Sequence, residues 1–517
     1  MSKETNPHTL NHELLLSKAG QRWQLVAVAL VVIFAAIVRM TAYSGYVGGD
    51  DRFYLTDAVK MSNGYFEPER HWQSRLMMVL PAAAIHRVIS GSLIAIIALP
   101  FAWSILCVAL TYSIGREIYG EHRTALLGCL FLAVFPLHMI MSTQYFPAMG
   151  ITACTASAFL LFLQGEKRRS RVLYFLSGVL LGLAFMHRET AIFMLLPFFV
   201  HVAIQRRWTT GYTLAVIGFG GVVLIECVAF YILFDDPLYR IHLLTGIGTT
   251  APSASYEQIR PGGRLFSPVV SLVTNQEYGL FWLFIVAAVF VLVRRRDRMS
   301  YSLLMWLILV GLYTLWGTTS LSGYRNLRPW PRYMAMVIIP AALLLARWLV
   351  LMQSKKILCI ATIMIVTSSL FCVYVDNSRT YMSLGKQLVE LKSTQPSNVW
   401  IVLGTTYADM YFANDMREID GIKLLEGATV HTAHKIQPAL EVVKADDAHI
   451  VPHLLLRGLD DESPVPEGAT ATVSIYRHRT DIARLLESTG QFGMKLAQKL
   501  SPIEGYCLYQ LENNFGK

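Results

Sequence analysis

Long apolar runs separated by short polar segments dominate the chain up to about residue 375. A helix needs about 20 mostly apolar residues to cross the hydrocarbon core of a bilayer. We therefore predict a membrane-spanning helix wherever such a run occurs, which gives eleven spans. They cover residues 23–43, 92–115, 123–141, 147–163, 172–186, 190–204, 211–234, 278–293, 301–319, 333–350 and 357–375.

The pattern changes after residue 375, where β-rich and helix-like pieces alternate. Strands are expected at 399–403, 449–456, 472–476 and 506–511, and a helix at 480–488. The expected fold class is a polytopic α-helical membrane protein with about 11 transmembrane helices and a C-terminal soluble α/β or α+β domain. We divide the chain into an N-terminal segment, 1–22, a membrane domain, 23–375, and a soluble domain, 376–517.

The composition excludes a soluble protein, because 54% of the residues are hydrophobic, only 15% are charged and the mean hydropathy is +0.44. The net charge of +10 does not indicate nucleic-acid binding, since Lys and Arg lie in short blocks between the apolar runs. If each run crosses once, all these blocks fall on one side. The blocks are Lys18 and Arg22, Arg116 and Arg123, Lys167-Arg168-Arg169-Arg171, Arg206-Arg207, Arg294-Arg295-Arg296-Arg298 and Lys355-Lys356.

Cationic residues accumulate on the cytoplasmic side of membrane proteins, so these blocks predict a cytoplasmic N-terminus. The first apolar run follows a polar start and has no cleavage site after it, which indicates a retained anchor and not a signal peptide. An odd number of spans places residues 376–517 outside. We expect a multi-pass protein of a prokaryotic inner (plasma) membrane.

Asp50 and Asp51 lie side by side in the first exterior loop, residues 44–91, just beyond the first span. We expect a short helix at 51–61 and an interfacial helix at 74–89, with Asn63-Gly64 at the turn between them. A helix N-terminus stabilises carboxylates, and Asp is a favoured N-cap residue, so capping alone is one interpretation. The other is a pair of acids held at the membrane rim, where an enzyme would place a general base.

Basic residues on the exterior side are informative, because the orientation rule does not explain them. Arg188 and Glu189 form a polar break between two spans, where they either neutralise each other or present Arg188 to an anion. Arg332 and Tyr333 open the tenth span, in a loop that either anchors the chain at the interface or binds phosphate. The other exterior arginines are Arg52, Arg75, Arg240, Arg260, Arg264, Arg325 and Arg328. Acids and cations that face a lipid surface suit a lipid-linked phosphate ester.

The motif Asp50-Asp51-x-x-Tyr54-x-x-x-Ala58 resembles the acidic signature, usually Asp-Glu-x-x-Tyr-x-x-x-Ala, of the GT-C membrane glycosyltransferases related to protein O-mannosyltransferases and the lipid A aminoarabinose transferase. The likeness covers roughly residues 23–350. It continues in Gly182-Leu183-Ala184-x-x-x-His187-Arg188-Glu189-Thr190-Ala191, and in Pro331-Arg332-Tyr333 followed by Pro340.

Three departures from the family pattern concern the acceptor class more than the reaction type. Asp51 stands where Glu is commoner. The exterior turn between the third and fourth spans has Gln144 and its neighbours where many members carry an acid. The family's His-Pro-Pro-Leu is replaced by His71-Trp72-Gln73-Ser74.

The resemblance implies an inverting glycosyltransferase that moves a sugar from a polyprenyl-phosphate donor to a glycan, lipid or protein acceptor on the exterior face. Asp50 would be the general base on the acceptor hydroxyl, and Asp51 would hold the acceptor or assist the oxocarbenium-like sugar. Arginines would stabilise the departing lipid phosphate. The implied phosphate-binding residues are Arg332, Arg188 and Arg75, and the implied substrate-lining residues are Tyr54, Trp72, Glu189 and Tyr333.

The resemblance implies no cofactor, although Asp50 with Asp51 could bind a divalent metal ion. The seven cysteines form no CxxC metal site and no disulfide framework. The expected partners are the donor lipid, the acceptor and the bilayer, without nucleic acid. Two alternatives stay open: a transporter or flippase of lipid-linked sugars, which would need broken helices and internal symmetry, and an exterior-face polysaccharide polymerase or ligase.

Overall fold

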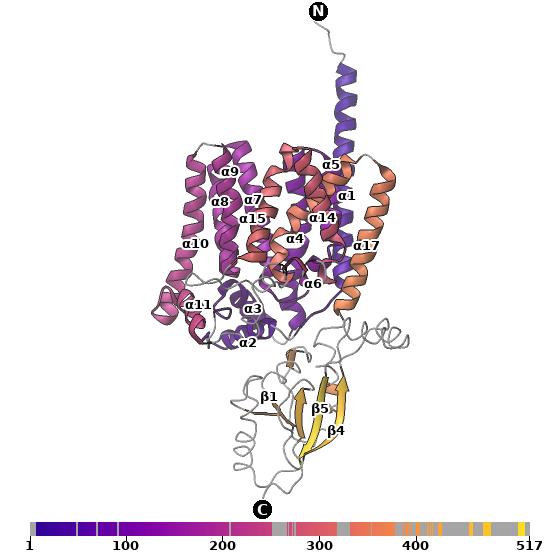
Figure 1. Ribbon diagram of the computed structural model, residues 1–517. Helices are drawn as coiled ribbons and strands as arrows, with labels where there is room; N and C mark the ends of the chain where they lie inside the picture. The colour runs from indigo at the N-terminus through magenta and orange to yellow at the C-terminus, as the bar shows by residue number, and fades with distance from the viewer. Residues whose placement is uncertain are drawn as a thin grey trace, which may run out of the picture. The chain divides into compact units, whose positions relative to one another are not determined.

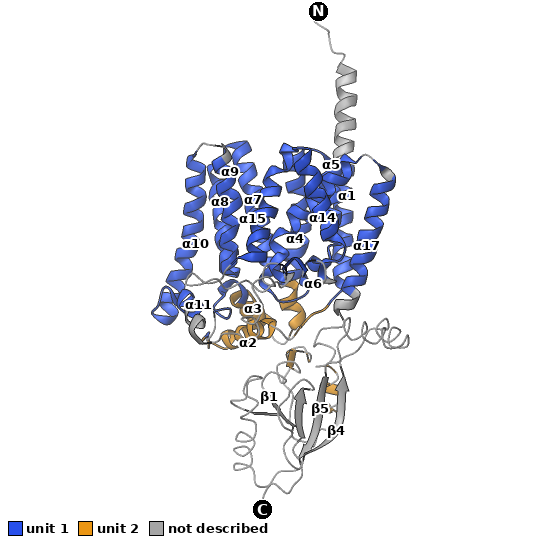
Figure 2. Cartoon of the chain, in the orientation of Figure 1, with its two compact units in different colours: residues 1–43, 68–78, 99–373 blue, residues 44–67, 79–98, 374–517 orange. Residues whose placement is uncertain are grey.

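The computed structural model describes most of the helical region and parts of the remainder. The described residues are 7–47, 50–68, 71–89, 92–205, 208–250, 266, 268–270, 272, 276–317, 331–352, 354–377, 386, 388–390, 392–393, 400–403, 411–412, 414, 416, 422–425, 454–458, 469–476 and 505–511. The chain divides into two compact units, which Figure 2 shows in different colours. Unit 1 comprises residues 1–43, 68–78 and 99–373, and unit 2 comprises residues 44–67, 79–98 and 374–517.

Unit 1 is a bundle in which most of the helices run side by side (Figure 1). Residues 93–98 of α4 and 374–377 of α17 belong to unit 2. The α-helices of the bundle are α1 (Pro7–Thr41), α4 (Leu93–Tyr119), α5 (His122–Ala133), α6 (Pro136–Met141), α7 (Pro147–Arg168), α8 (Arg171–His187), α9 (Leu195–Gln205), α10 (Thr210–Phe234), α11 (Tyr239–Thr250), α14 (Phe281–Arg294), α15 (Tyr301–Trp316), α16 (Ile338–Leu351) and α17 (Lys355–Asn377). Four 3-10 helices accompany them: η1 (Glu189–Met194), η2 (Gln276–Tyr278), η3 (Arg298–Ser300) and η4 (Pro331–Val337).

Seven of the described helices are long and apolar enough to cross a membrane. These candidate spans are Arg22–Thr41, Leu93–Tyr119, Pro147–Arg168, Thr210–Phe234, Arg298–Trp316, Arg332–Leu351 and Lys356–Val373. The four other predicted spans coincide with shorter apolar helices, within His122–Ala133, Arg171–His187, Glu189–Ala203 and Phe281–Arg294. The mostly helical membrane architecture is confirmed, and the number eleven stays a prediction.

The third predicted span, residues 123–141, is not one helix. α5 ends at Ala133 and α6 begins at Pro136, so two short helices replace it. Proline lacks a backbone N–H and has a fixed φ, which suits the first position of a helix and not its interior. The prediction of a continuous span was wrong because the residues on both sides of Pro136 are equally apolar. The sixth and tenth predicted spans begin with 3-10 turns, η1 and η4.

Glycines bring α8 and α10 close together. A Cβ at Gly178 would overlap the carbonyl oxygen of Ala215, and a Cβ at Gly182 would lie 2.6 Å from the Val222 side chain. Small residues at such positions allow two helix backbones to approach within a membrane. Gly178 and Gly182 are therefore packing positions. A Cβ at Gly220, in contrast, would meet nothing within 4 Å, so this glycine does not serve packing.

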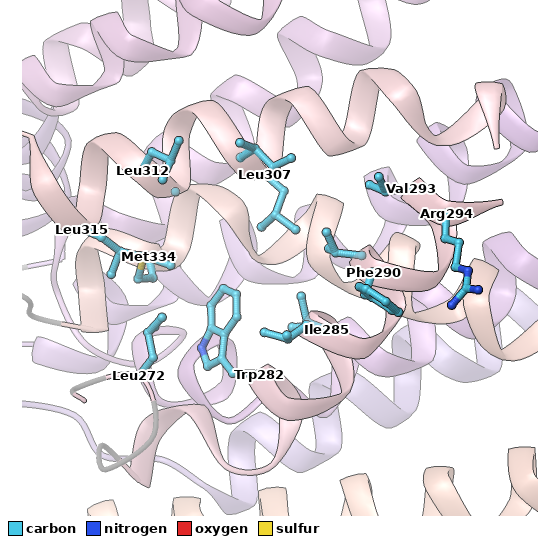
Figure 3. A pocket seen from close by; sticks show the side chains of 14 residues that line it. Leu272, Trp282, Ile285, Phe290, Val293, Arg294, Leu307, Leu312, Leu315 and Met334 are labelled. Carbon is cyan, nitrogen blue, oxygen red and sulfur yellow. The ribbon is translucent and has the colours of Figure 1, made fainter. Parts of the chain in front are cut away.

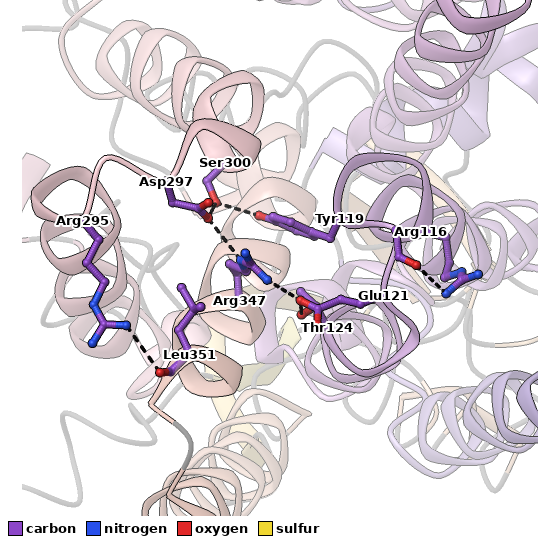
Figure 4. A network of polar contacts seen from close by, with 10 residues as sticks. Arg116, Tyr119, Glu121, Thr124, Arg295, Asp297, Ser300, Arg347 and Leu351 are labelled. Carbon is purple, nitrogen blue, oxygen red and sulfur yellow. Dashed lines mark hydrogen bonds and ion pairs between the residues drawn. The ribbon is translucent and has the colours of Figure 1, made fainter.

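Arg347 on α16 connects three other elements through a polar network (Figure 4). Its Nε donates to Asp297 at 3.1 Å, and its Nη1 pairs with Glu121, which precedes α5. Asp297 also accepts a hydrogen bond from Ser300 Oγ at 2.8 Å, and that hydroxyl lies 3.0 Å from the Tyr119 hydroxyl at the end of α4. The network fixes the ends of α4, α5, α15 and α16 against one another.

Unit 2 contains α2 (Asp50–Ser62), most of α3 (Leu76–Val88) and a five-stranded mixed sheet. The strands are β1 (Trp400–Leu403), β2 (Ile422–Leu425), β3 (Leu454–Gly458), β4 (Ala469–Tyr476) and β5 (Gly505–Leu511). Their spatial order is β2-β1-β3-β5-β4, with β1 parallel to β2 and β3, and β5 antiparallel to β3 and β4. Four strands overlap predicted ones, whereas β2 was not predicted. The helix predicted at 480–488 lies outside the described residues.

Candidate functional site

The acidic pair lies in the first turn of α2, one residue earlier than the predicted start of this helix. Asp51 is fully buried, and its Oδ2 accepts the Val47 N–H at 2.6 Å. This bond fixes the chain that leads into α2, and the N-terminal end of the helix stabilises both negative charges. Asp50 is only half-buried. Asp50 is therefore the more accessible carboxylate of the two.

The other side chains around α2 are packed. Tyr54, predicted to line the substrate path, is completely buried. Arg52 Nε donates to the Tyr46 hydroxyl at 3.0 Å. The Tyr46 ring packs on the Phe412 ring, with the two ring centroids 5.0 Å apart. These contacts hold the start of α2 rigidly within unit 2.

The polar break predicted between two spans lies where α8 ends and η1 begins. Arg188 has an extended backbone there, with φ −168° and ψ 138°. The preceding His187 is fully buried, with its Nδ1 3.5 Å from Met78 Sδ and its ring edge-on to Trp103 at 4.8 Å. Gly150 makes room for it, since a Cβ at Gly150 would overlap the imidazole. Packing on three sides thus fixes the point from which Arg188 extends.

Glu189 is the centre of a buried network of two acids and two arginines. It accepts from Arg75 Nη2 at 3.0 Å and from the Arg240 guanidinium at 2.9 Å. Arg240 also donates to Glu226 at 2.6 Å and to the Phe185 carbonyl at 3.1 Å. The side chains of Arg75, Arg240 and Glu226 are each 5% exposed. Buried charges require such pairing, because burial without a partner is costly.

This network changes the interpretation of two predicted site residues. Arg75, predicted to bind phosphate, and Glu189, predicted to line the substrate, hold each other. Sequence reasoning missed Glu226 and treated Arg240 only as one of several exterior arginines. A lone acid within the apolar sequence of α10 is the signal that could have found Glu226, because an ionisable group at membrane depth needs a partner.

Arg188 and Arg332 both lie against aromatic rings. The Cζ of Arg188 is 3.7 Å from the centroid of the Tyr333 ring. The Cζ of Arg332 is 5.3 Å from the Phe146 ring and 5.8 Å from the Tyr333 ring. The three segments that meet here precede α7, follow α8 and open η4. Cation–π contacts of this kind orient the guanidinium plane, which suits the two-pronged recognition of a phosphate.

His71 and Trp72 lie before α3, in the part of the loop that belongs to unit 1. Their rings are edge-to-face at 4.8 Å. The Nδ1 of His71 is buried and has no hydrogen-bond partner in the described part of the chain. Burial lowers the pKa of His71 to about 4; Glu189 opposes this effect and nearby arginines, Arg75 first, reinforce it. His71 is therefore neutral at neutral pH.

The predicted site residues fall into two groups. Unit 1 brings Arg75 to Glu189, and Arg188 and Arg332 to Tyr333, with Trp72 in the loop before α3. Asp50, Asp51 and Tyr54 belong to unit 2. Among the residues that the structure describes, no three His, Cys, Asp or Glu side chains form a group that could hold a metal ion.

Residues 76–232 match the family described as dolichyl-phosphate-mannose-protein mannosyltransferase. Among solved structures, ArnT from Cupriavidus metallidurans bound to undecaprenyl phosphate is similar, with a TM-score of 0.56 and 13% identity over 93% of this chain and 97% of ArnT. The chain has the fold of the GT-C membrane glycosyltransferases. Another structure of this GT-C fold is the archaeal oligosaccharyltransferase AglB from Archaeoglobus fulgidus, in complex with an inhibitory peptide and a dolichol-phosphate. Its TM-score is 0.53, with 12% identity over 84% of this chain and 69% of AglB.

A comparison of the sequence with curated proteins gives no match. The superfamily resemblance drawn from the acidic motif, the break after α8 and the start of η4 is nevertheless confirmed. The family that residues 76–232 match is described as a dolichyl-phosphate-mannose-protein mannosyltransferase, and both of the similar solved structures are described with a lipid phosphate.

Proposed function

We propose that this GT-C protein is an inverting glycosyltransferase that moves a sugar from a polyprenyl-phosphate donor to a glycan, lipid or protein acceptor. The match of residues 76–232 to a family named for transfer from dolichyl phosphate is the observation that carries the proposal. The lipids in the ArnT and AglB structures are polyprenyl-type phosphates, the class of lipid that remains when such a donor has lost its sugar. The basic blocks that follow the positive-inside rule support action on the exterior face.

In this proposal Asp50 takes the proton of an acceptor hydroxyl. The acceptor oxygen then attacks the anomeric carbon as the bond from that carbon to the donor phosphate oxygen breaks, which inverts the configuration. The products are the glycosylated acceptor and a polyprenyl phosphate. The half-buried position of Asp50 supports its assignment as the base, because a base must come within hydrogen-bond reach of its substrate. The buried Asp51 serves to position the start of α2.

We assign the donor phosphate to Arg188 and Arg332. The departing phosphate gains negative charge in the transition state, so an arginine bound to it lowers the barrier more than it stabilises the ground state. The contact of both arginines with Tyr333 supports a shared phosphate site in unit 1. Arg75 is assigned a different role, since it pairs with Glu189 and thereby positions the segment that carries Arg188.

The test is a transfer assay with the purified protein in proteoliposomes. A panel of polyprenyl-phosphate sugars, hexoses and pentoses, would be supplied with an exterior-face envelope extract as the acceptor source. We expect one donor to lose its sugar, with release of polyprenyl phosphate and an inverted glycosidic linkage in the product by NMR. Liposomes without protein and reactions with the matching nucleotide sugar serve as controls.

Two results would contradict the proposal. If every lipid keeps its sugar while one of them crosses the bilayer, the protein is a transporter or flippase. If the nucleotide sugar is consumed in place of the lipid-linked one, the donor class is wrong.

A further inference from the structure

An apolar groove runs between α14 and α15, two helices of unit 1 (Figure 3). Its cavity volume is about 780 Å³, a size typical of sites for small organic molecules. Its walls are almost wholly hydrophobic, and four of the apolar side chains in them are strongly exposed: Val286 at 67%, Phe290 at 64%, and Val293 and Leu312 at 51% each. Because both helices lie in the apolar bundle, the groove is suited to a hydrocarbon chain.

The groove is widened by a glycine on α15. Gly311 is itself buried, yet a Cβ added there would meet no heavy atom within 4 Å. The missing side chain therefore leaves open space beside the wall formed by α14. A side chain that begins at this position would therefore extend into open space from its Cβ.

One charged residue lines the groove, and it lies at one end. Figure 3 shows Arg294 beyond Val293, while Leu315 and Met334 lie at the opposite end. Arg294 is exposed and makes no hydrogen bond or ion pair within the described part of the chain. The neighbouring Arg295 points elsewhere, since it donates to the Leu351 carbonyl at 3.4 Å.

The length of the groove matches one leaflet of a bilayer. The wall of α14 runs from Trp282 to Arg294, which is about 18 Å at a rise of roughly 1.5 Å per residue. The hydrocarbon core is about 30 Å thick, so one leaflet measures about 15 Å. An acyl chain of a single leaflet would thus reach the end of the groove when its head group lies at Arg294.

We propose that this groove binds an anionic glycerophospholipid, with one acyl chain between α14 and α15 and the phosphate on Arg294. Arginine recognises phosphate with paired hydrogen bonds, and an unpaired arginine at the end of an apolar channel is complementary to an acidic head group. The head-group end of this groove, at Arg294, lies at the opposite end from Met334, which directly follows the donor-phosphate residues Arg332 and Tyr333. Lipid binding at Arg294 does not depend on glycosyl transfer.

The test is native mass spectrometry of the detergent-solubilised protein titrated with phosphatidylglycerol, phosphatidylcholine and polyprenyl phosphate. We expect phosphatidylglycerol to bind about fivefold more tightly than phosphatidylcholine, the preference that one basic residue near an anionic lipid gives. Arg294→Gln should remove that preference. Gly311→Leu should prevent binding of both phospholipids at this site.

Matched controls keep the test specific. Arg298→Gln removes a charge from the same basic block outside the groove, and Gly220→Leu adds a side chain at an equally open glycine on α10. Both should bind lipid as the wild type does. Equal binding of the two phospholipids, or loss of polyprenyl-phosphate binding in Gly311→Leu, would overturn the proposal. If Gly311→Leu does not fold, the comparison of Arg294→Gln with Arg298→Gln decides the matter.

Discussion

Arg188 lies on the Tyr333 ring at the end of α8, and its charge is the feature we assign to the donor phosphate. Replacing it in Arg188→Gln should lower kcat/KM for the lipid-linked donor by roughly 10- to 100-fold, since a hydrogen bond to a charged group contributes about 1.5–3 kcal/mol. Arg188→Lys should recover only part of the loss, because lysine keeps the charge and not the planar fork. Initial rates over a range of donor concentrations measure both effects.

The control is Arg116→Gln, which removes a half-buried arginine whose one hydrogen bond within the described part of the chain goes to the Gly120 carbonyl at 2.9 Å. Its kcat/KM for the donor should equal that of the wild type. An unchanged kcat/KM in Arg188→Gln would exclude Arg188 from contact with the donor phosphate.

His71 makes the stability of the folded protein depend on pH in the acidic range. In the unfolded chain His71 takes up a proton near pH 6.5, whereas burial lowers its pKa in the folded protein to about 4. Between these values the unfolded state binds the extra proton, so the free energy of unfolding falls as the pH drops from about 6.5 to about 4. The loss is at most about 3 kcal/mol. Above pH 6.5 the contribution of His71 is complete.

Unfolding midpoints in detergent between pH 8 and pH 4 would measure this effect. His71→Gln should show a shallower decline over the same interval, since glutamine does not titrate. Equal slopes for the variant and the wild type would show that other groups cause the acid sensitivity.

The sequence allowed single site residues to be predicted where a local motif marks them. It did not reveal which residues pair with partners that are distant along the chain. Asp50 and Asp51 could be placed at a helix start because acids favour that position. The two arginine partners of Glu189, Arg75 and Arg240, could not be predicted, because no sequence motif around Glu189 links it to either of them. Only the fold brings these side chains together.

At the scale of elements, Arg240 joins α11 to α8, η1 and α10. Arg240→Met should lower the free energy of unfolding by about 3–5 kcal/mol, the range observed when one partner of a buried ion pair is removed. Adding Glu226→Gln should restore part of this loss, because it removes the acid left without its arginine. Thermal unfolding in detergent would measure the stabilities, and we expect the wild type to be most stable, the double variant next and Arg240→Met least stable. If Arg240→Met melts like the wild type, the role of the ion pairs is contradicted.

The α8–α10 contact offers a matched pair of glycines. Gly178→Ala should destabilise the protein by about 1–3 kcal/mol, since the new methyl group overlaps the Ala215 carbonyl and the helices must separate. Gly220→Ala on the opposite, open side of α10 should change the melting temperature little. Similar melting of both variants would refute the close helix contact.

The existence of the helices was predictable, and their interruptions were not. Each span was predicted from the length of its apolar run alone. That length does not reveal a break between two equally apolar halves, as at Pro136. The proline was the available signal, because it favours the first turn of a helix. The 3-10 helix η4 likewise begins at a proline, Pro331. η1 has no proline at its start, and the polar residue Arg188 precedes it.

For the whole molecule, hydropathy and the order of three motifs sufficed to predict a GT-C membrane protein. β1, β4 and β5 overlap predicted strands because they contain several β-branched or aromatic residues. β3 overlaps the predicted segment 449–456, in which Ile450 and Val451 are β-branched. β2 (Ile422–Leu425) was not predicted because Ile422 is its only β-branched residue and it contains no aromatic residue. The identities of the donor sugar and the acceptor could not be predicted from the sequence, since one fold serves many reactions and no local motif specifies either substrate.

The most direct measurement is the rate of a single turnover of the lipid-linked donor by Asp50→Asn. Losing the general base should slow sugar transfer by about 10²- to 10⁴-fold, while the variant melts like the wild type. Glu67→Gln, which alters an exposed acid bonded to Tyr65, should transfer at the normal rate. A near-normal rate in Asp50→Asn would contradict the assignment of Asp50 as the base.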